Sequence, residues 1–279
     1  MTGRVFGEDA AALAGPGMPV GDLFDLEQAV DDGLGLPARG LWMDAHVHLG
    51  RDRDGHTLDL PGLLADLERF GIASAVCFPP DDPGPGGQFA QANDAVLAAA
   101  AAAPERVRPF CRLDPGRPWR DELERVAAAG ACGIKLHPIA QRFRPEGEEC
   151  VAVVRAATEL GWPVLLHAGY GARPLAGPVA ALTEAVPRAR LILAHAGRGD
   201  ARALAAVAAS APGVVFDTSL AALPDLVALP PGRLCFGSDR PYGDYASALH
   251  LIDAAARVAG WSDRDVEGVM WGNLSGILS

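Results

Sequence analysis

After its first forty residues, the chain alternates short apolar runs with helical stretches rich in Ala, Leu and Val. Eight apolar runs follow one another, over residues 41–49, 73–78, 107–113, 132–137, 163–167, 191–195, 214–218 and 234–238. Runs that are apolar throughout are typical of strands buried on both faces of a sheet. Their alternation with helices predicts a parallel sheet that is covered by helices.

The stretches between the runs are expected to be helices, over residues 63–70, 88–103, 121–129, 148–160, 179–186, 201–210, 222–229 and 245–259. Eight strand-helix units in about 240 residues favour an α/β fold of the closed (β/α)8 TIM barrel type over an open doubly wound sheet. No G-x-G-x-x-G motif follows the first run, which also argues against the open sheet. An extra C-terminal helix is predicted over 263–278, and we expect it to pack on the outside of the barrel.

Residues 1–40 do not follow this alternation. They contain seven acidic residues and only two basic ones, together with a narrow apolar stripe of Leu23, Leu26 and Val30. We therefore predict an N-terminal acidic arm over 1–40, docked on a barrel domain over 41–279. Alternatively, the arm could act as a lid or form a contact between subunits. The protein could therefore be a homo-oligomer.

The composition excludes several classes of protein. With 49% hydrophobic and 21% charged residues, the chain is too apolar for a disordered protein. Its net charge of −11 would repel a nucleic acid backbone. The sequence has no apolar run long enough for a membrane span and no leader with a basic region and an apolar core. We expect a cytoplasmic protein that binds neither nucleic acid nor membrane.

Five of the seven histidines lie at the ends of predicted strands, and Gly or Pro follows each end within two or three residues. These histidines are His46, His48, His137, His167 and His195. The last strand is followed by Asp239, which supplies a carboxylate at the same level. A single histidine of this kind is most often a core residue, but active sites of such barrels gather at the C-terminal strand ends. Imidazole and carboxylate groups suit zinc and other divalent ions.

Six segments together resemble the amidohydrolase superfamily, and within it the amidohydrolase-2 branch that includes relatives of aminocarboxymuconate-semialdehyde decarboxylase. The segments are D-A-H-V-H at 44–48, G-I-K-L-H-P at 133–138, V-L-L-H-A-G at 164–169, L-I-L-A-H-A-G at 191–197, F-G-S-D-R-P at 236–241 and G-N-L-S-G-I-L at 272–278. The resemblance covers residues 41–279. It implies that the metal ligands are His46, His48, His167 and Asp239. It also implies that His195 either binds a second metal ion or orients the attacking water.

Lys135 is the only lysine among 24 basic residues, and alternation along the strand places it on the same face as His137. In several members of the superfamily a lysine at this strand is carboxylated and bridges two metal ions, whereas the amidohydrolase-2 branch is mostly associated with one. We predict one divalent ion per chain, with zinc favoured, and an ammonium group of Lys135 that faces the substrate. Two ions would be held if Lys135 were carboxylated.

A metal-activated water gives the predicted mechanism. Asp239 is the expected general base, His195 holds the water or the oxyanion, and Lys135 is the third catalytic residue. The predicted substrate-binding residues are His137, Arg112, Arg240, Asp217 and Ser219. Arginines gather after the strand ends and favour a small substrate that carries a carboxylate, although they could instead pair with acidic neighbours. Arg240 stands where the family often has an aromatic residue, so the resemblance is not extended to substrate details.

The favoured function is a metal-dependent hydrolase that acts on a C–N or C–O bond, and a lactonase is one form of it. A nonoxidative decarboxylase is the alternative, because the resemblance implies the same ligand set for both reactions. An alternative from another class is a catalytically silent barrel used for binding.

Overall fold

The computed structural model describes residues 41–82, 88–171 and 174–279. The predicted acidic arm over 1–40 lies outside the described residues. The parallel strands are β1 (Trp42–His48), β4 (Ile72–Phe78), β5 (Val107–Pro109), β6 (Cys111–Arg112), β7 (Ile134–Leu136), β8 (Pro163–Leu166), β9 (Arg190–Leu193), β10 (Val214–Asp217) and β11 (Leu234–Cys235). The two short strands β5 and β6 are the halves of one predicted run, so all eight predicted strands are confirmed.

Backbone hydrogen bonds close the strands into a ring. One sheet has the order β1-β4-β5 and the other has the order β11-β10-β9-β8-β7-β6. Phe110 joins β5 to β6, and its N–H donates to the Cys77 carbonyl at 2.8 Å. At the other seam the Ala45 N–H donates to the Phe236 carbonyl at 2.8 Å, and the His48 N–H donates to the Arg240 carbonyl at 2.7 Å. The ring is a (β/α)8 TIM barrel, as predicted.

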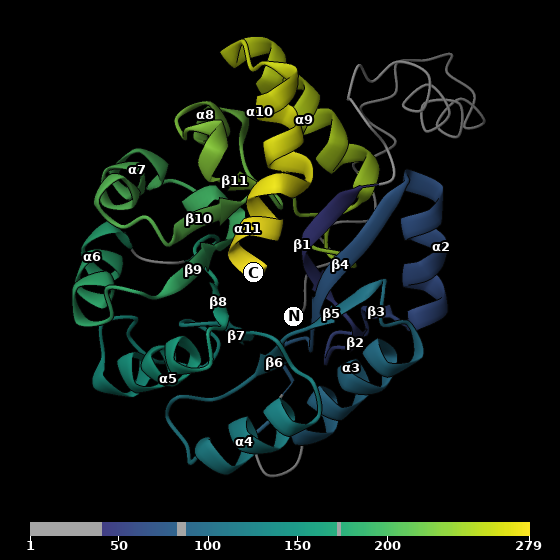
Figure 1. The fold of residues 1–279 in the computed structure, drawn as a ribbon, viewed down its shortest axis with the longest axis vertical. Helices are drawn as coiled ribbons and strands as arrows, with labels where there is room; N and C mark the ends of the chain where they lie inside the picture. The colour runs from purple at the N-terminus through teal and green to yellow at the C-terminus, as the bar shows by residue number, and fades with distance from the viewer. Residues whose placement is uncertain (1–40, 83–87, 172–173) are drawn as a thin grey trace, which may run out of the picture. The chain divides into compact units, whose positions relative to one another are not determined.

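Helices surround the ring of strands (Figure 1). They are α2 (Leu60–Phe70), α3 (Ala90–Ala102), α4 (Arg120–Ala128), α5 (Glu148–Glu159), α6 (Ala176–Ala185), α7 (Ala201–Ser210), α8 (Leu223–Val227) and α9 (Tyr245–Ala259). α2 shows how the sequence sets helix limits: Asp59 accepts a hydrogen bond from the Gly62 N–H at its start, and Gly71 ends it with φ 66°. Two shorter elements, β2 (Gly50–Arg51) and β3 (Thr57–Leu58), form an antiparallel hairpin after β1. Among the described residues, no helix is long and apolar enough to cross a membrane.

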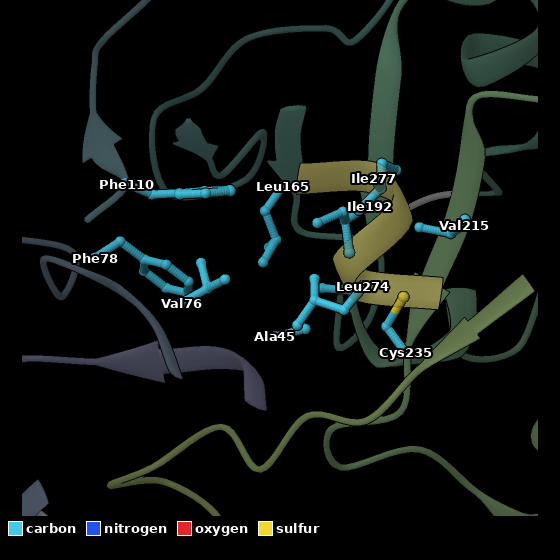
Figure 2. Packing of buried hydrophobic residues seen from close by; sticks show 11 residues of the cluster. Ala45, Val76, Phe78, Phe110, Leu165, Ile192, Val215, Cys235, Leu274 and Ile277 are labelled. Atoms are coloured by element: carbon cyan, nitrogen blue, oxygen red, sulfur yellow. The ribbon is translucent and has the colours of Figure 1, made fainter. Parts of the chain in front are cut away.

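The C-terminal segment differs from its expected place outside the barrel. It consists of α10 (Asp263–Glu267), a π-helical turn over Gly268–Gly272 and α11 (Asn273–Leu278). Leu274 and Ile277 of α11 belong to the same buried cluster as Leu165, Ile192 and Val215 of the strands, as Figure 2 shows. The prediction of an outer helix is wrong, because the apolar face of α11 covers the core.

Hydrogen bonds place α11 at the end of the barrel where the strands begin. The Asn273 amide nitrogen donates to the Leu234 carbonyl at 2.7 Å, at the start of β11. The Arg190 guanidinium donates to the Ile277 carbonyl at 3.2 Å, at the start of β9. The opposite end, where the strands finish, carries the predicted site residues.

We expect Leu274→Ala to lower the free energy of unfolding by about 2–5 kcal/mol, because the change leaves a cavity in the core. The matched control is Val258→Ala on α9, where the side chain is 65% exposed and the change should stay within about 0.5 kcal/mol. Urea unfolding followed by circular dichroism measures both. Equal, small effects of the two variants would contradict the internal position of α11.

Candidate active site

Four side chains converge where β1, β7 and β11 finish. His46 and His48 point to the same side of β1 because side chains alternate along a strand. The His46 Nε2 atom lies 3.3 Å from the His48 Nε2 atom and 3.2 Å from the Asp239 Oδ1 atom. The His48 Nε2 atom lies 3.1 Å from that same oxygen. The Lys135 Nζ atom lies 3.3 Å from the His46 Nε2 atom.

The spacing of these atoms fits a metal ion. Ligands that lie about 2.0–2.1 Å from a tetrahedral zinc ion lie about 3.3 Å from one another. The Asp239 Oδ1 atom is buried and accepts no hydrogen bond from the described residues. A buried carboxylate oxygen of this kind is costly unless a cation faces it. His46, His48 and Asp239 could therefore hold a divalent ion.

Asp217 fixes the orientation of His46. The His46 Nδ1 atom lies 2.8 Å from the Asp217 Oδ2 atom, and a carboxylate only accepts, so Nδ1 carries the proton and Nε2 presents a lone pair. Burial and Lys135 lower the pKa of His46, but Asp217 and Asp239 raise it more, so the net shift is upward. This arrangement of carboxylate, imidazole and lone pair is typical of metal-binding histidines.

Asp217 also accepts hydrogen bonds from residues that follow β9 and β10. Its Oδ1 atom accepts from the His195 N–H at 3.1 Å, the Ser219 N–H at 3.0 Å and the Ser219 hydroxyl at 2.5 Å. Burial raises the pKa of Asp217, but His46 and these hydrogen bonds hold it below its ordinary value. Asp217 and Ser219 are both fully buried. Both side chains are engaged with the imidazoles and with each other, and their contact with substrate stays a prediction.

The unprotonated ring nitrogens of His167 and His195 face each other. The His167 Nε2 atom donates to the Gly169 carbonyl at 2.8 Å, and the His195 Nδ1 atom donates to the Ser219 carbonyl at 3.0 Å. The remaining atoms, His167 Nδ1 and His195 Nε2, are 3.1 Å apart. Burial lowers the pKa of His167 to about 2 and that of His195 to about 4, so both rings are neutral. Two facing lone pairs repel unless a cation or a water proton lies between them.

The backbone at this edge is unusual. His195, Ala196 and Asp239 have φ angles of 59°, 54° and 61°, in the left-handed region that L-residues seldom adopt. Gly169 makes room for the His195 turn, since a Cβ atom at Gly169 would lie 2.9 Å from the His195 side chain. Such strain at several site residues is a feature of functional sites.

Lys135 is fully buried beside this cluster. Its Nζ atom lies 4.8 Å from the centre of the Phe78 ring. Burial and the nearby Arg112 lower the pKa of Lys135 to about 7. No carboxylate of the described residues lies within ion-pair distance of the Lys135 Nζ atom. His137, which was predicted to share its strand face, stacks on His167 with ring centres 3.8 Å apart.

The structure places the two predicted arginines differently. Arg112 is fully buried, with its Nε donating to the Pro79 carbonyl at 3.2 Å and its Nη1 paired with Asp81 at 2.9 Å. Its Nη2 atom has no hydrogen-bond partner within the described part of the chain. Arg240 instead pairs with Asp66 of α2 at 2.6 Å. The structure brings Arg112 next to Lys135 in the sheet but engages Arg240 in an ion pair away from the cluster.

Two tyrosines beside the histidines were missed by the sequence analysis. The Tyr242 ring lies 5.0 Å from the His48 ring, and its hydroxyl donates to the Asp52 carboxylate at 2.7 Å. The Tyr170 ring lies 5.6 Å from the His195 ring. Both follow the ends of the predicted strands, over residues 163–167 and 234–238, by three or four residues, and that position was the only signal that could have found them.

The barrel and the histidine-aspartate cluster at its C-terminal strand ends define a TIM-barrel enzyme. Residues 43–273 match the sequence profile of the amidohydrolase family. The chain belongs to this family, in the amidohydrolase-2 branch, and is an enzyme rather than a catalytically silent binding barrel. Enzymes of this family act on small-molecule substrates. No curated protein matches the chain.

Solved structures similar to this chain have the same fold at low sequence identity. A protein of Pseudomonas putida described as a 2-pyrone-4,6-dicarboxylic acid hydrolase has 19% identity and a TM-score of 0.64, over 86% of this chain and 98% of that one. A 5-carboxyvanillate decarboxylase of Sphingomonas paucimobilis has 16% identity and a TM-score of 0.63, over 86% and 99%. An uncharacterised TIM-barrel protein of Bordetella bronchiseptica has 14% identity and a TM-score of 0.69, over 85% and 98%.

Proposed function

We propose that the enzyme is a metal-dependent hydrolase that cleaves a C–N or C–O bond of a small molecule bearing a carboxylate. The observation that supports it best is the buried Asp239 Oδ1 atom, which faces the His46 and His48 nitrogens without a hydrogen bond. His46, His48 and Asp239 would hold one divalent ion, with zinc favoured by the imidazole-rich donor set. His167 is the fourth ligand that the resemblance implies, and its Nδ1 lone pair is available for this role.

A bound divalent ion lowers the pKa of water from 15.7 towards about 7 and polarises a carbonyl group. Asp239 accepts the proton of the attacking water and returns it to the leaving group. Burial raises the pKa of Asp239, but His46 and His48 hold it well below its ordinary value, so the carboxylate is ionised and able to accept. His195 presents a lone pair at Nε2, so it accepts a hydrogen from the water and orients it.

The substrate carboxylate is recognised by Arg112 and Lys135. A buried guanidinium nitrogen without a partner, such as the Arg112 Nη2 atom, carries a desolvation cost that a carboxylate oxygen offsets. Lys135 supplies a second positive group next to it in the sheet. His137 adds a hydrogen-bond donor: its Nδ1 atom accepts from the Ala140 N–H at 3.3 Å, so its proton is on Nε2.

A decarboxylase is the second candidate. The same pair of cations, Arg112 and Lys135, would then hold the carboxylate that leaves rather than one that serves for recognition. A 5-carboxyvanillate decarboxylase is among the similar structures, and its substrate name contains such a carboxylate. The two reactions differ in the origin of the product atoms, which is where they can be separated.

We expect the purified enzyme to contain about one equivalent of zinc and to hydrolyse members of a panel of lactones, amides and aromatic acids that carry a carboxylate. Turnover in 18O-labelled water should place one labelled oxygen in the product, detected by mass spectrometry. Release of CO2 without label in the product would establish the decarboxylase instead. Two equivalents of metal, one of them lost in Lys135→Arg, would establish the carboxylated lysine. A chain that binds no metal contradicts the proposal.

A further inference from the structure

A cavity of about 630 Å³ lies between the loops that follow β7 and β8. Its walls come from residues within 138–146, from Gly171 and from residues within 174–178. The first of these groups leads into α5 and the last into α6. Neither the metal cluster nor the pair of Arg112 and Lys135 contributes a side chain to this cavity.

The cavity adjoins the active site through both loops. Pro138, in its wall, directly follows His137, whose ring stacks on His167. Gly171, in the opposite wall, directly follows Tyr170, whose ring lies beside His195. Both cavity walls thus begin directly after residues that contact the histidines.

Prolines and other apolar residues make up most of the cavity lining, together with Arg142, Arg144 and Glu146. The side chains of Phe143 and Leu175 are buried in its walls, at 8% and 5% exposure, and prolines supply much of the remaining surface. Ile139 is 44% exposed at the opening and reaches across to Gly171. Such a surface binds aryl or alkyl groups, because their burial removes apolar area from water.

Among the described residues at the rim of the cavity, Arg142 carries a positive charge without an ion pair. Arg144 is engaged by Glu146, with its Nε atom 2.9 Å from the carboxylate. Arg142 lies in the same loop and makes no ion pair or side-chain hydrogen bond with the described residues. Its backbone is in the left-handed region, with φ 57°, and its N–H donates to the Ile139 carbonyl at 3.3 Å. The tight turn thus presents the Arg142 guanidinium at the rim.

We propose that this cavity is a second substrate subsite, which takes an apolar arm, aryl or alkyl, ending in an anionic group at Arg142. The proposal rests on the proposed function in one respect: the other end of the substrate lies at the histidine-aspartate cluster. The substrate class is then an extended molecule with a hydrolysable group at one end and an acidic group at the other. The subsite would discriminate between substrates by the size and the charge of this arm. The group that reacts at the histidine-aspartate cluster would be the same in all of them.

The test uses two probes that share an apolar body and differ in charge, 4-phenylbutanoate and 4-phenylbutan-1-ol. Binding to the full chain is measured by saturation-transfer NMR and calorimetry. We expect Arg142→Gln to weaken the acid about tenfold and to leave the alcohol unchanged, since only the acid makes a charge-assisted contact. Ile139→Asp should weaken both. Arg257→Gln is the matched control, because Arg257 lies on α9, outside the cavity lining, and is paired with Asp253 at 2.8 Å; it should leave both unchanged.

Two results would overturn the subsite. One is equal binding of the acid to the native chain and to Arg142→Gln, which would place the carboxylate at Arg112 or the metal. The other is binding of both probes that Ile139→Asp does not alter. The measurements are repeated after the metal has been removed with a chelator, and the cavity should still bind the probes. If the chain as purified contains no metal but binds the probes, the proposed function is refuted and the subsite is not, whereas a metal-containing chain that does not bind them refutes the subsite only.

Discussion

Asp239→Asn is expected to abolish metal binding and turnover while the barrel still folds. The amide removes the negative charge that faces His46 and His48, so the two imidazoles no longer have an anionic partner to complete the ligand set. The loss of activity should exceed the roughly 10–100-fold expected for residues outside the ligand set. Metal content by plasma mass spectrometry, together with circular dichroism, measures both effects.

The matched control for this change is Asp253→Asn, which removes a carboxylate from the surface of α9. Asp253 pairs with Arg257 at 2.8 Å on the same helix. An exposed pair of this type contributes little to stability, so the variant should keep full metal content and activity. A full equivalent of metal in Asp239→Asn would show that Asp239 is not a ligand, and the proposed mechanism would then lose its base.

Asp217→Asn is expected to weaken metal affinity by about 10–100-fold, although Asp217 is not in the proposed ligand set of His46, His48 and Asp239. The carboxylate fixes the proton of His46 on Nδ1 at 2.8 Å. A neutral amide is a poorer acceptor, and it can also turn its own N–H towards the imidazole. The lone pair of His46 at Nε2 is then less basic and less often directed at the ion. Competition with a chromophoric chelator gives the affinity.

Ser219→Ala separates this effect from a general loosening of the site. Ser219 donates to the other oxygen of Asp217, and its hydroxyl lies 3.2 Å from the His46 Nδ1 atom, so Ser219→Ala removes this longer contact and leaves the 2.8 Å contact between Asp217 and His46 in place. We expect a smaller loss of metal affinity than for Asp217→Asn. If the two variants bound metal as tightly as the native chain, the role given to Asp217 would be refuted.

The periodicity of the sequence predicts the barrel well, because strands buried on both faces must be apolar over their whole length. The same argument does not locate α11. Leu274 and Ile277 are three residues apart, which indicates one apolar face of a helix. That spacing is identical for a helix on the outside of the barrel and for one that covers the start of its strands, so only the packed structure distinguishes them.

The site is predicted in part for a similar reason. Two histidines at alternate positions of a strand must share a face, so the convergence of His46 and His48 follows from the sequence. The partner of each polar group does not follow. Arg240 was expected to bind the substrate, but in the structure it pairs with Asp66, which lies 174 residues earlier in the sequence. The protonated nitrogen of each imidazole likewise depends on carbonyls and carboxylates that only the fold brings near.

The position of α11 has a consequence for synthesis of the protein. A nascent chain that has emerged from the ribosome as far as α9 already contains all eight strands and the eight helices around them. It still lacks Leu274 and Ile277, which share their buried cluster with Ala45 and Val76 near the other end of the barrel sequence. Domains generally fold as units. The ring is therefore expected to stay open to chaperones until Ile277 leaves the exit tunnel, and to fold only after translation of the barrel is complete.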